Sequence, residues 1–218
     1  MYKLIHKEFM LLINQFVIAV PIGIISSIMF TQAYPDYGYA MGAFAFAWVS
    51  SIAPSMEAKN HTEIIINSLP VLRSEIILAK YLSPFLYAAF GLLLVALAGI
   101  LVNISPLSFH LPYFKCQNVV ITLISVSALV SIYYPLLYRF HNNVVIFVNV
   151  ALSQLFLFMP SSIDNYINGH TNVSWVQQML QYNLYTPWAL SLLGITIALM
   201  LLIISYLLTV KIYTAKDF

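Results

Sequence analysis

The residues of this chain whose types could do chemistry are few, and their spacing matches no catalytic site. Its five histidines stand in separate segments, and none belongs to the His-Glu-x-x-His pattern of a zinc protease. The pair His61-x-Glu63 lacks the two cysteines of a zinc deaminase, because Cys116 is the only cysteine. No Gly-x-Ser-x-Gly turn presents a serine nucleophile. We therefore expect no catalytic residue, no metal ligand and no cofactor bound by this chain.

A nucleotide site of the P-loop type is also missing from the sequence. No glycine is followed by Lys-Ser or Lys-Thr, the residues that hold phosphate and Mg²⁺ in such a loop. The formal net charge of +2 and the absence of a basic cluster give no reason to expect a nucleic-acid partner. If the protein moves a substrate, we expect the driving energy to come from outside its apolar segments.

The sequence contains six long apolar runs, and none of them contains a charged residue or a histidine. The chain is 61% apolar and 7% charged, whereas soluble proteins carry roughly 25% charged residues. We therefore expect one all-α integral membrane domain over residues 1–218, without a proton relay inside it. Pro135 is expected to kink or end the fourth run, and Pro160 to end the fifth. The predicted spans are residues 9–30, 37–53, 81–102, 117–138, 144–159 and 188–210.

The lysines and arginines predict the orientation of these spans. An even number of spans places both termini on one side, and positive residues favour the cytoplasmic side. Eight of the nine positive residues fall on the side of the termini, and only Lys115 falls opposite. We expect both termini and residues 54–80 in the cytoplasm, and residues 161–186 outside. The eight residues are Lys3, Lys7, Lys59, Arg73, Lys80, Arg139, Lys211 and Lys216.

The first residues form an amphipathic pattern of their own. Leu4, Ile5, Phe9 and Leu12 share one helical stripe, which predicts a helix lying on the inner membrane surface. The alternative is a charged start to the first span. The apolar run that follows is longer than the 7–15 residues of a cleaved signal peptide. The polar residues assigned to this helix are Lys3, Lys7 and Glu8.

Two sets of uncharged residues inside the runs favour contacts between helices. The second run places small residues four apart, which lets helix backbones approach closely in lipid, either within one subunit or at a subunit or gate contact. The fifth run contains three polar residues that suit interhelical hydrogen bonds or the wall of a cargo path. The small residues are Gly38, Gly42, Ala43 and Ala47, and the polar residues are Asn149, Ser153 and Gln154.

The segment between the second and third runs is the most distinctive stretch of the sequence. It mixes both charges with the apolar triplet Ile64–Ile66, which needs cover from lipid or from a partner protein. Pro70 suits the first turn of a helix, so we expect a helix from Pro70 through Arg73 and Glu75 into the third run. The alternative for this segment is a solvated linker.

The same segment resembles the second cytoplasmic segment of ABC-2 type transporter permeases. The likeness rests on Met56-Glu57-Ala58-Lys59-Asn60, then Ile66-Asn67-Ser68-Leu69-Pro70-Val71-Leu72-Arg73-Ser74-Glu75, then Lys80-Tyr81. Leu72 and the triplet before the motif depart from the family pattern, which usually carries serine at the position of Leu72. At the level of topology the resemblance extends over the whole chain.

The resemblance implies an ABC-2, type V exporter-like permease that forms half of a transmembrane pair. A second permease, identical or homologous, and separate ABC ATPase subunits would complete the transporter, and the ATPases would bind ATP and Mg²⁺. Residues 161–186 would form outer re-entrant helices, where Trp175, Val176, Met179 and Leu180 make an apolar stripe. The implied residues for coupling to the ATPase are Glu57, Lys59, Asn67, Ser68, Leu69, Pro70, Arg73 and Glu75.

Together these observations predict a non-catalytic exporter subunit in the lipid of a bacterial cytoplasmic membrane, moving amphipathic peptide, drug or lipid-like cargo. Small permeases of this kind resemble those of peptide exporters such as the phenol-soluble modulin exporter. The alternative is a stand-alone membrane immunity or sensor protein that binds a peptide or toxin, and co-purification of an ATPase separates the two. A proton-coupled carrier is disfavoured because the runs lack ionisable side chains.

Overall fold

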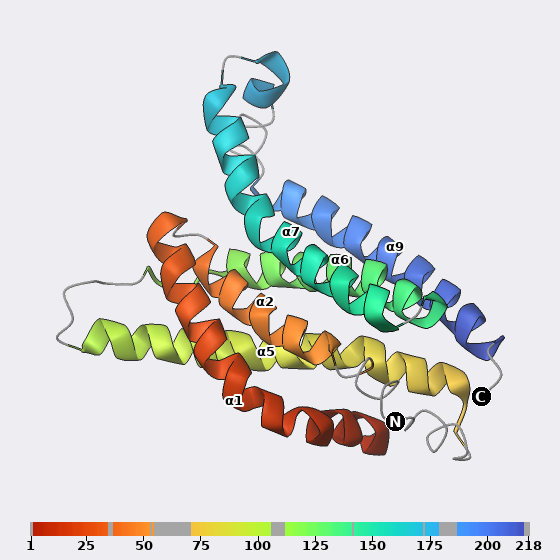
Figure 1. Cartoon of the computed structure of the whole chain (residues 1–218). Coiled ribbons are helices and arrows are strands. Elements are labelled where there is room, and N and C mark those ends of the chain that lie inside the picture. Colours follow the sequence, from red (N-terminus) through yellow and green to blue (C-terminus); the bar gives the residue numbers. More distant parts are fainter. Residues whose placement is uncertain are drawn as a thin grey trace.

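The computed structural model describes residues 2–34, 37–52, 54, 71–105, 112–140, 142–171, 173–178 and 187–215. These residues form helices and contain no strand, and each of the six apolar runs corresponds to one helix. Both labelled termini lie toward the same end of the helices (Figure 1). The helices are α1 Tyr2–Ala33, α2 Gly38–Ser51, α5 Arg73–Ile104, α6 Cys116–Arg139, α7 Asn142–Gly169 and α9 Pro187–Thr214.

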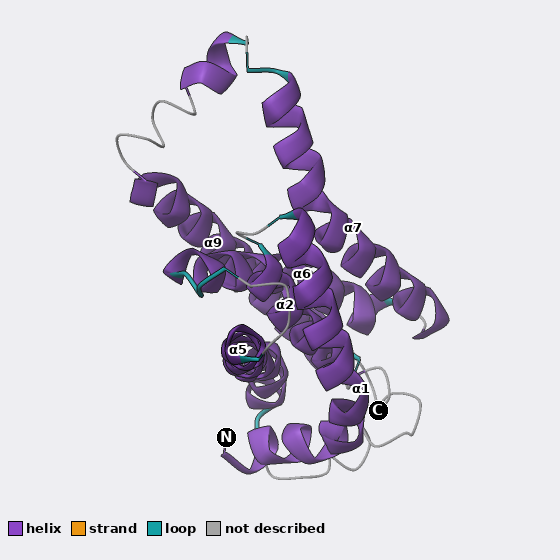
Figure 2. Ribbon diagram, turned by 90° about the vertical axis from the view of Figure 1, so that its left-hand side faces the viewer, coloured by secondary structure: helices purple, strands orange, loops and turns teal. Residues whose placement is uncertain are grey.

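The short helix α2 lies inside the protein. Of its 14 residues, 13 are buried, and it packs against α1, α5 and α6 (Figures 1 and 2). Its glycines and alanines remove the side-chain bulk that would hold these neighbours apart. At 1.5 Å per residue the helix is roughly 21 Å long, which is less than the ~30 Å hydrocarbon layer. Helix α2 is therefore an interior packing element with little contact to lipid.

Two apolar clusters hold the bundle together. The larger cluster joins α2, α5, α6, α7 and α9 and contains five buried tyrosines, among them Tyr133 and Tyr134 at 0% exposure. The smaller joins α1, α2 and α5 around Phe46 and Val95. Most of the apolar side chains of α9 are exposed, as expected for a helix that faces lipid.

Three of the helices are long and apolar enough to cross a membrane, counted over the described residues. They are Arg73–Ile104, Cys116–Arg139 and Ser191–Thr214, and two shorter apolar stretches are Val17–Thr31 and Val144–Phe156. The all-helical class agrees with the expectation from sequence. Six complete spans stay a prediction.

Two prolines do not end their helices. Helix α6 continues past Pro135 to Arg139, and α7 continues past Pro160 to Gly169, so the expectation that Pro160 ends the fifth helix is wrong. A proline removes one backbone N–H, and a membrane helix keeps its other hydrogen bonds on both sides of that position. Helix α7 changes direction along its length (Figure 1).

Candidate functional site

The start of α5 contains the two predicted coupling residues that the structure describes. The Arg73 guanidinium donates a 3.0 Å hydrogen bond from Nη1 to the carbonyl oxygen of Thr214 at the end of α9. Glu75 lies in the first turn of α5, where the helix dipole favours a negative charge. Leu72 precedes them with 68% of its surface exposed. This corner of the protein, at the start of α5, thus combines an exposed apolar side chain, a positive and a negative charge, and a direct hydrogen bond to α9.

The helix at this corner begins later than the sequence suggested. Helix α5 starts at Arg73, and Leu72 has an extended backbone with φ −66° and ψ 136°. The expected start at Pro70 is therefore wrong, because the chain turns into the helix only after Leu72. The other predicted coupling residues lie outside the described residues; they are Glu57, Lys59, Asn67, Ser68, Leu69 and Pro70.

A chain of hydroxyl groups joins α5, α6 and α9 just beyond this corner. The Tyr81 hydroxyl lies 2.7 Å from both Ser205 Oγ and Thr209 Oγ1, and Ser205 donates to the Ser131 carbonyl at 2.8 Å. Because Ser205 has only one hydroxyl proton, it must accept the proton of Tyr81, so Thr209 donates to Tyr81. This network was not among the predictions from the sequence, although Ser205 and Thr209 stand four apart in the sixth apolar run.

Lys80 is buried in the same region, with 1% of its surface exposed. Its ammonium nitrogen lies 5.8 Å from the centre of the Tyr138 ring, and the Tyr134 hydroxyl donates to its carbonyl oxygen at 3.0 Å. A buried charged group was not expected, because the apolar runs contain none, and Lys80 corrects that expectation. Lys80 stands one residue before the third apolar run, where its aliphatic stem can pack on apolar neighbours while an aromatic face attracts the charge.

Two of the three polar residues of the fifth run face the interior of the protein, and the third faces outward. Asn149 is buried on α7, and its Nδ2 donates to Ser51 Oγ of α2 at 3.0 Å; Ser51 in turn donates to the Trp48 carbonyl at 2.7 Å. Ser153 is buried and donates to the Val150 carbonyl of its own helix at 2.7 Å. Gln154 is exposed. Of the three, only Gln154 faces away from the rest of the protein.

The small residues of α2 lie where helices cross. A β-carbon on Gly42 would lie 2.8 Å from the Gly23 carbonyl oxygen and 3.0 Å from both Ser27 Cβ and Val95 Cγ2. A β-carbon on Gly38 would collide with Thr31 of α1. Ala43 and Ala47 are fully buried, each with 0% exposure. The packing served by these four residues lies within this chain.

The first residues belong to one continuous helix with the first apolar run. Helix α1 extends over Tyr2–Ala33 with Pro21 inside it, and it runs in two directions along its length (Figure 1). Lys7 is half-buried, and the side chains of Lys3 and Glu8 are not among those that the structure describes. A surface helix would thus pass into the first span without a break in the helix.

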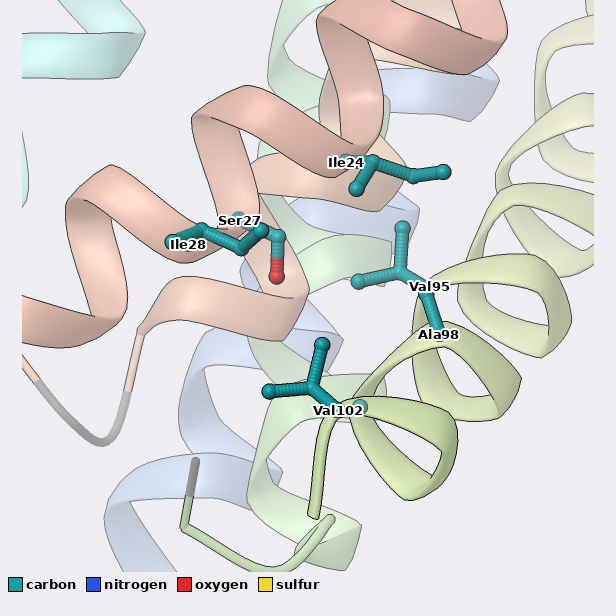
Figure 3. A pocket seen from close by; sticks show the side chains of 7 residues that line it. Ile24, Ser27, Ile28, Val95, Ala98 and Val102 are labelled. Carbon is teal, nitrogen blue, oxygen red and sulfur yellow. The ribbon is translucent and has the colours of Figure 1, made fainter. Parts of the chain in front are cut away.

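A shallow hollow with room for about one water molecule lies between α1 and α5. Figure 3 shows Ile24 and Ser27 of α1 opposite α5 across this hollow, which Ile28 also lines. Ser27 supplies the only hydroxyl group of the lining, so the hollow offers little to a polar ligand. Its α5 wall consists of Val95, Ala98, Gly99 and Val102.

Helices of membrane-span length and a largely lipid-like surface define an integral membrane protein. The described residues contain no group of three metal-ligating side chains. The sequence model of the ABC-2 family transporter proteins matches residues 3–214, and the chain therefore belongs to that family. Searches among proteins with curated descriptions and among solved structures returned no match. The family consists of multi-pass permeases of ABC transporters, which implies an ABC ATPase as partner.

Proposed function

We propose that this chain is the permease of an exporter in a bacterial cytoplasmic membrane, paired with a second permease and driven by separate ATPase subunits. The observation that carries the proposal is the family match over residues 3–214. The lack of a P-loop sequence supports separate ATPases, because this chain offers no site of that type for ATP.

The decisive experiment measures ATP turnover. Purified alone, the chain is expected to hydrolyse no ATP above background, because it has no P-loop glycine-lysine pair. Expressed with its partner ABC ATPase, the chain is expected to retain that protein through purification and to gain ATP hydrolysis. ATP turnover that survives removal of every other protein would contradict the proposal. Failure to retain any ATPase would favour the stand-alone sensor instead.

The proposed topology has six spans with both termini in the cytoplasm, supported by the distribution of lysine and arginine. Reporter fusions after Ser108 and after Asn168 are expected to report the outer side. Fusions after His61 and after Phe218 are expected to report the cytoplasm. An outer signal at Phe218 would contradict an even number of spans.

Coupling to the ATPase is proposed to run through residues 54–80. The start of α5 supports this, because Arg73 is bonded to Thr214 and the Tyr206 hydroxyl reaches the Ser74 carbonyl at 3.3 Å. A push on the segment would therefore move α5 and α9 together. A partner can bias the permease only by contacting its two states unequally, so the segment needs a contact that ATP binding changes.

The proposed cargo is amphipathic: a peptide, a drug or a lipid-like molecule. Support comes from apolar runs that contain no charged residue to pair with a charged cargo group. Export is therefore expected to tolerate broad changes in cargo sequence, measured as efflux of a peptide series from cells with and without the transporter. Strict dependence of efflux on one charged cargo group would contradict this cargo class.

A further inference from the structure

Helices α5 and α9 are hydrogen-bonded to each other at two levels. At the first level, Arg73 bonds the carbonyl oxygen of Thr214, where α5 begins and α9 ends. At the second level, the Tyr81 hydroxyl lies 2.7 Å from the hydroxyl oxygens of both Ser205 and Thr209. Because Tyr81 stands eight residues after Arg73, the two levels are roughly 12 Å apart along α5. One link alone would leave a hinge, whereas two links at this separation fix the angle between the helices.

Helix α6 is joined to the second level as well. Ser205 donates to the Ser131 carbonyl oxygen of α6 at 2.8 Å. The Tyr134 hydroxyl of α6 donates at 3.0 Å to the carbonyl oxygen of Lys80, the residue before Tyr81. The rings of Tyr81 and Tyr134 also meet edge to face, with their centres 4.9 Å apart. Three helices are therefore held together around one tyrosine.

The Tyr81 hydroxyl would lose most if this network opened. The exposed fractions of Tyr81, Ser205 and Thr209 are 5%, 4% and 0%, so water is not at hand to replace a lost bond. Serine and threonine can turn to a carbonyl of their own helix, as Thr122 does with Asn118, but the tyrosine hydroxyl is too far from its own backbone. Apolar side chains lose little when one apolar neighbour replaces another. The Tyr81 hydroxyl is thus the group that resists sliding of α9 on α5.

We propose that Tyr81 is a positioning residue of the transport cycle, which holds α9 at a fixed angle to α5 so that movement of residues 54–80 reaches the far end of α9. This inference rests on the proposed function, in which an ATPase acts on that segment. Among the described helices, α9 packs chiefly against α6 and α5, and most of its other apolar side chains are exposed. Its direction therefore depends on the two neighbours that the Tyr81 network reaches.

Labelling of a cysteine at the far end of α9 tests this role. Trp188 lies in the first turn of α9 with 63% of its surface exposed, and Cys116→Ser removes the only native thiol. In nanodiscs that hold the purified complex with the ATPase, the rate at which a water-soluble maleimide labels Trp188→Cys is measured without nucleotide and with ATP plus vanadate. The two rates are expected to differ. Tyr81→Phe keeps the ring, and it is expected to lower this difference roughly threefold to tenfold while ATP hydrolysis is retained.

Tyr39→Phe is the matched control. Tyr39 is 3% exposed, and its hydroxyl donates to the Pro112 carbonyl oxygen at 2.8 Å, so this variant removes a buried hydroxyl that does not contact α9. It is expected to leave the nucleotide dependence of labelling unchanged. An equal loss with Tyr39→Phe and Tyr81→Phe would show a general structural effect and overturn the proposal. A labelling rate that does not respond to nucleotide when Tyr81 is in place would overturn it too.

Thr209→Val supplies a second, milder variant, because it removes the hydroxyl that donates to Tyr81 and keeps the shape of the side chain. It is expected to lower the nucleotide dependence about threefold. If Tyr81→Phe does not fold, Thr209→Val decides, and an unchanged dependence then overturns the proposal. If the complex keeps its ATPase and both variants keep the full dependence, this inference fails and the proposed function stands. If the unsubstituted chain retains no ATPase, both fail.

Discussion

Replacing Gly42 with leucine is expected to destabilise the folded protein severely in the membrane. The position that a side chain would occupy on Gly42 faces the Gly23 carbonyl oxygen, Ser27 and Val95. Even a β-carbon there would approach these groups within 2.8–3.0 Å. A backbone carbonyl cannot rotate away as a side chain can, so α1 or α5 must move. We expect a loss of about 3 kcal/mol or more in the free energy of unfolding. The measurement is the thermal unfolding midpoint of the purified protein in detergent, together with its abundance in the membrane.

Gly169 supplies the control for this substitution. A β-carbon there would meet no atom within 4 Å, so Gly169→Leu is expected to leave the unfolding midpoint nearly unchanged. Gly42→Ala should fall between the two leucine variants. If Gly42→Leu unfolds at the same temperature as the unsubstituted protein, the close crossing of α1, α2 and α5 is wrong.

Replacing Leu69 with aspartate is expected to uncouple the permease from its ATPase. The proposed docking surface would then carry an unpaired charge at a position expected to be covered by the partner. The expected cost is about 3 kcal/mol, or roughly a hundredfold weaker binding of the ATPase. Arg73→Glu is expected to cost about 1 kcal/mol in the same assay, because it reverses one charge at the edge of that surface. ATPase co-purification and export are measured at equal membrane abundance of each variant.

Tyr113 provides the matched control on the other side of the membrane. Its side chain is 88% exposed, and the proposed topology places it outside, away from any ATPase. Tyr113→Asp adds the same charge and is expected to leave ATPase binding unchanged. If Leu69→Asp and Arg73→Glu both keep full ATPase binding and full export, residues 54–80 are a linker and the coupling assignment is wrong.

The pattern of the sequence was enough to place the long helices. The apolar runs of residues 117–138 and 188–210 differ by only a few residues from α6 and α9. In lipid every backbone polar group must be bonded within its own segment, so a long apolar run has little choice but to form a helix. The same pattern does not show where helices end, because α7 continues through Pro160 into the mostly polar residues 161–169, where the apolar run has already ended.

Which face of each helix meets protein was decided by the tertiary structure. Asn149 and Gln154 are both amides in one apolar run, yet Asn149 lies against Ser51 and Gln154 lies on the opposite side. In soluble proteins polar residues mark the solvent side of a helix, but in lipid both sides are apolar and this signal is weak. The sequence alone therefore left the two amides equivalent.

The sequence by itself determined the class of this protein: an all-helical membrane subunit without a P-loop, whose segment between the second and third runs resembles that of ABC-2 permeases. Only the tertiary structure decided that α2 is enclosed by its neighbours, that Lys80 is buried beside Tyr138, and that Tyr81 joins three helices. The physical reason is the separation along the chain over which each kind of interaction acts. Composition and spacing act along a single segment, whereas enclosure and hydrogen bonding depend on residues such as Tyr81 and Ser205, which are 124 positions apart.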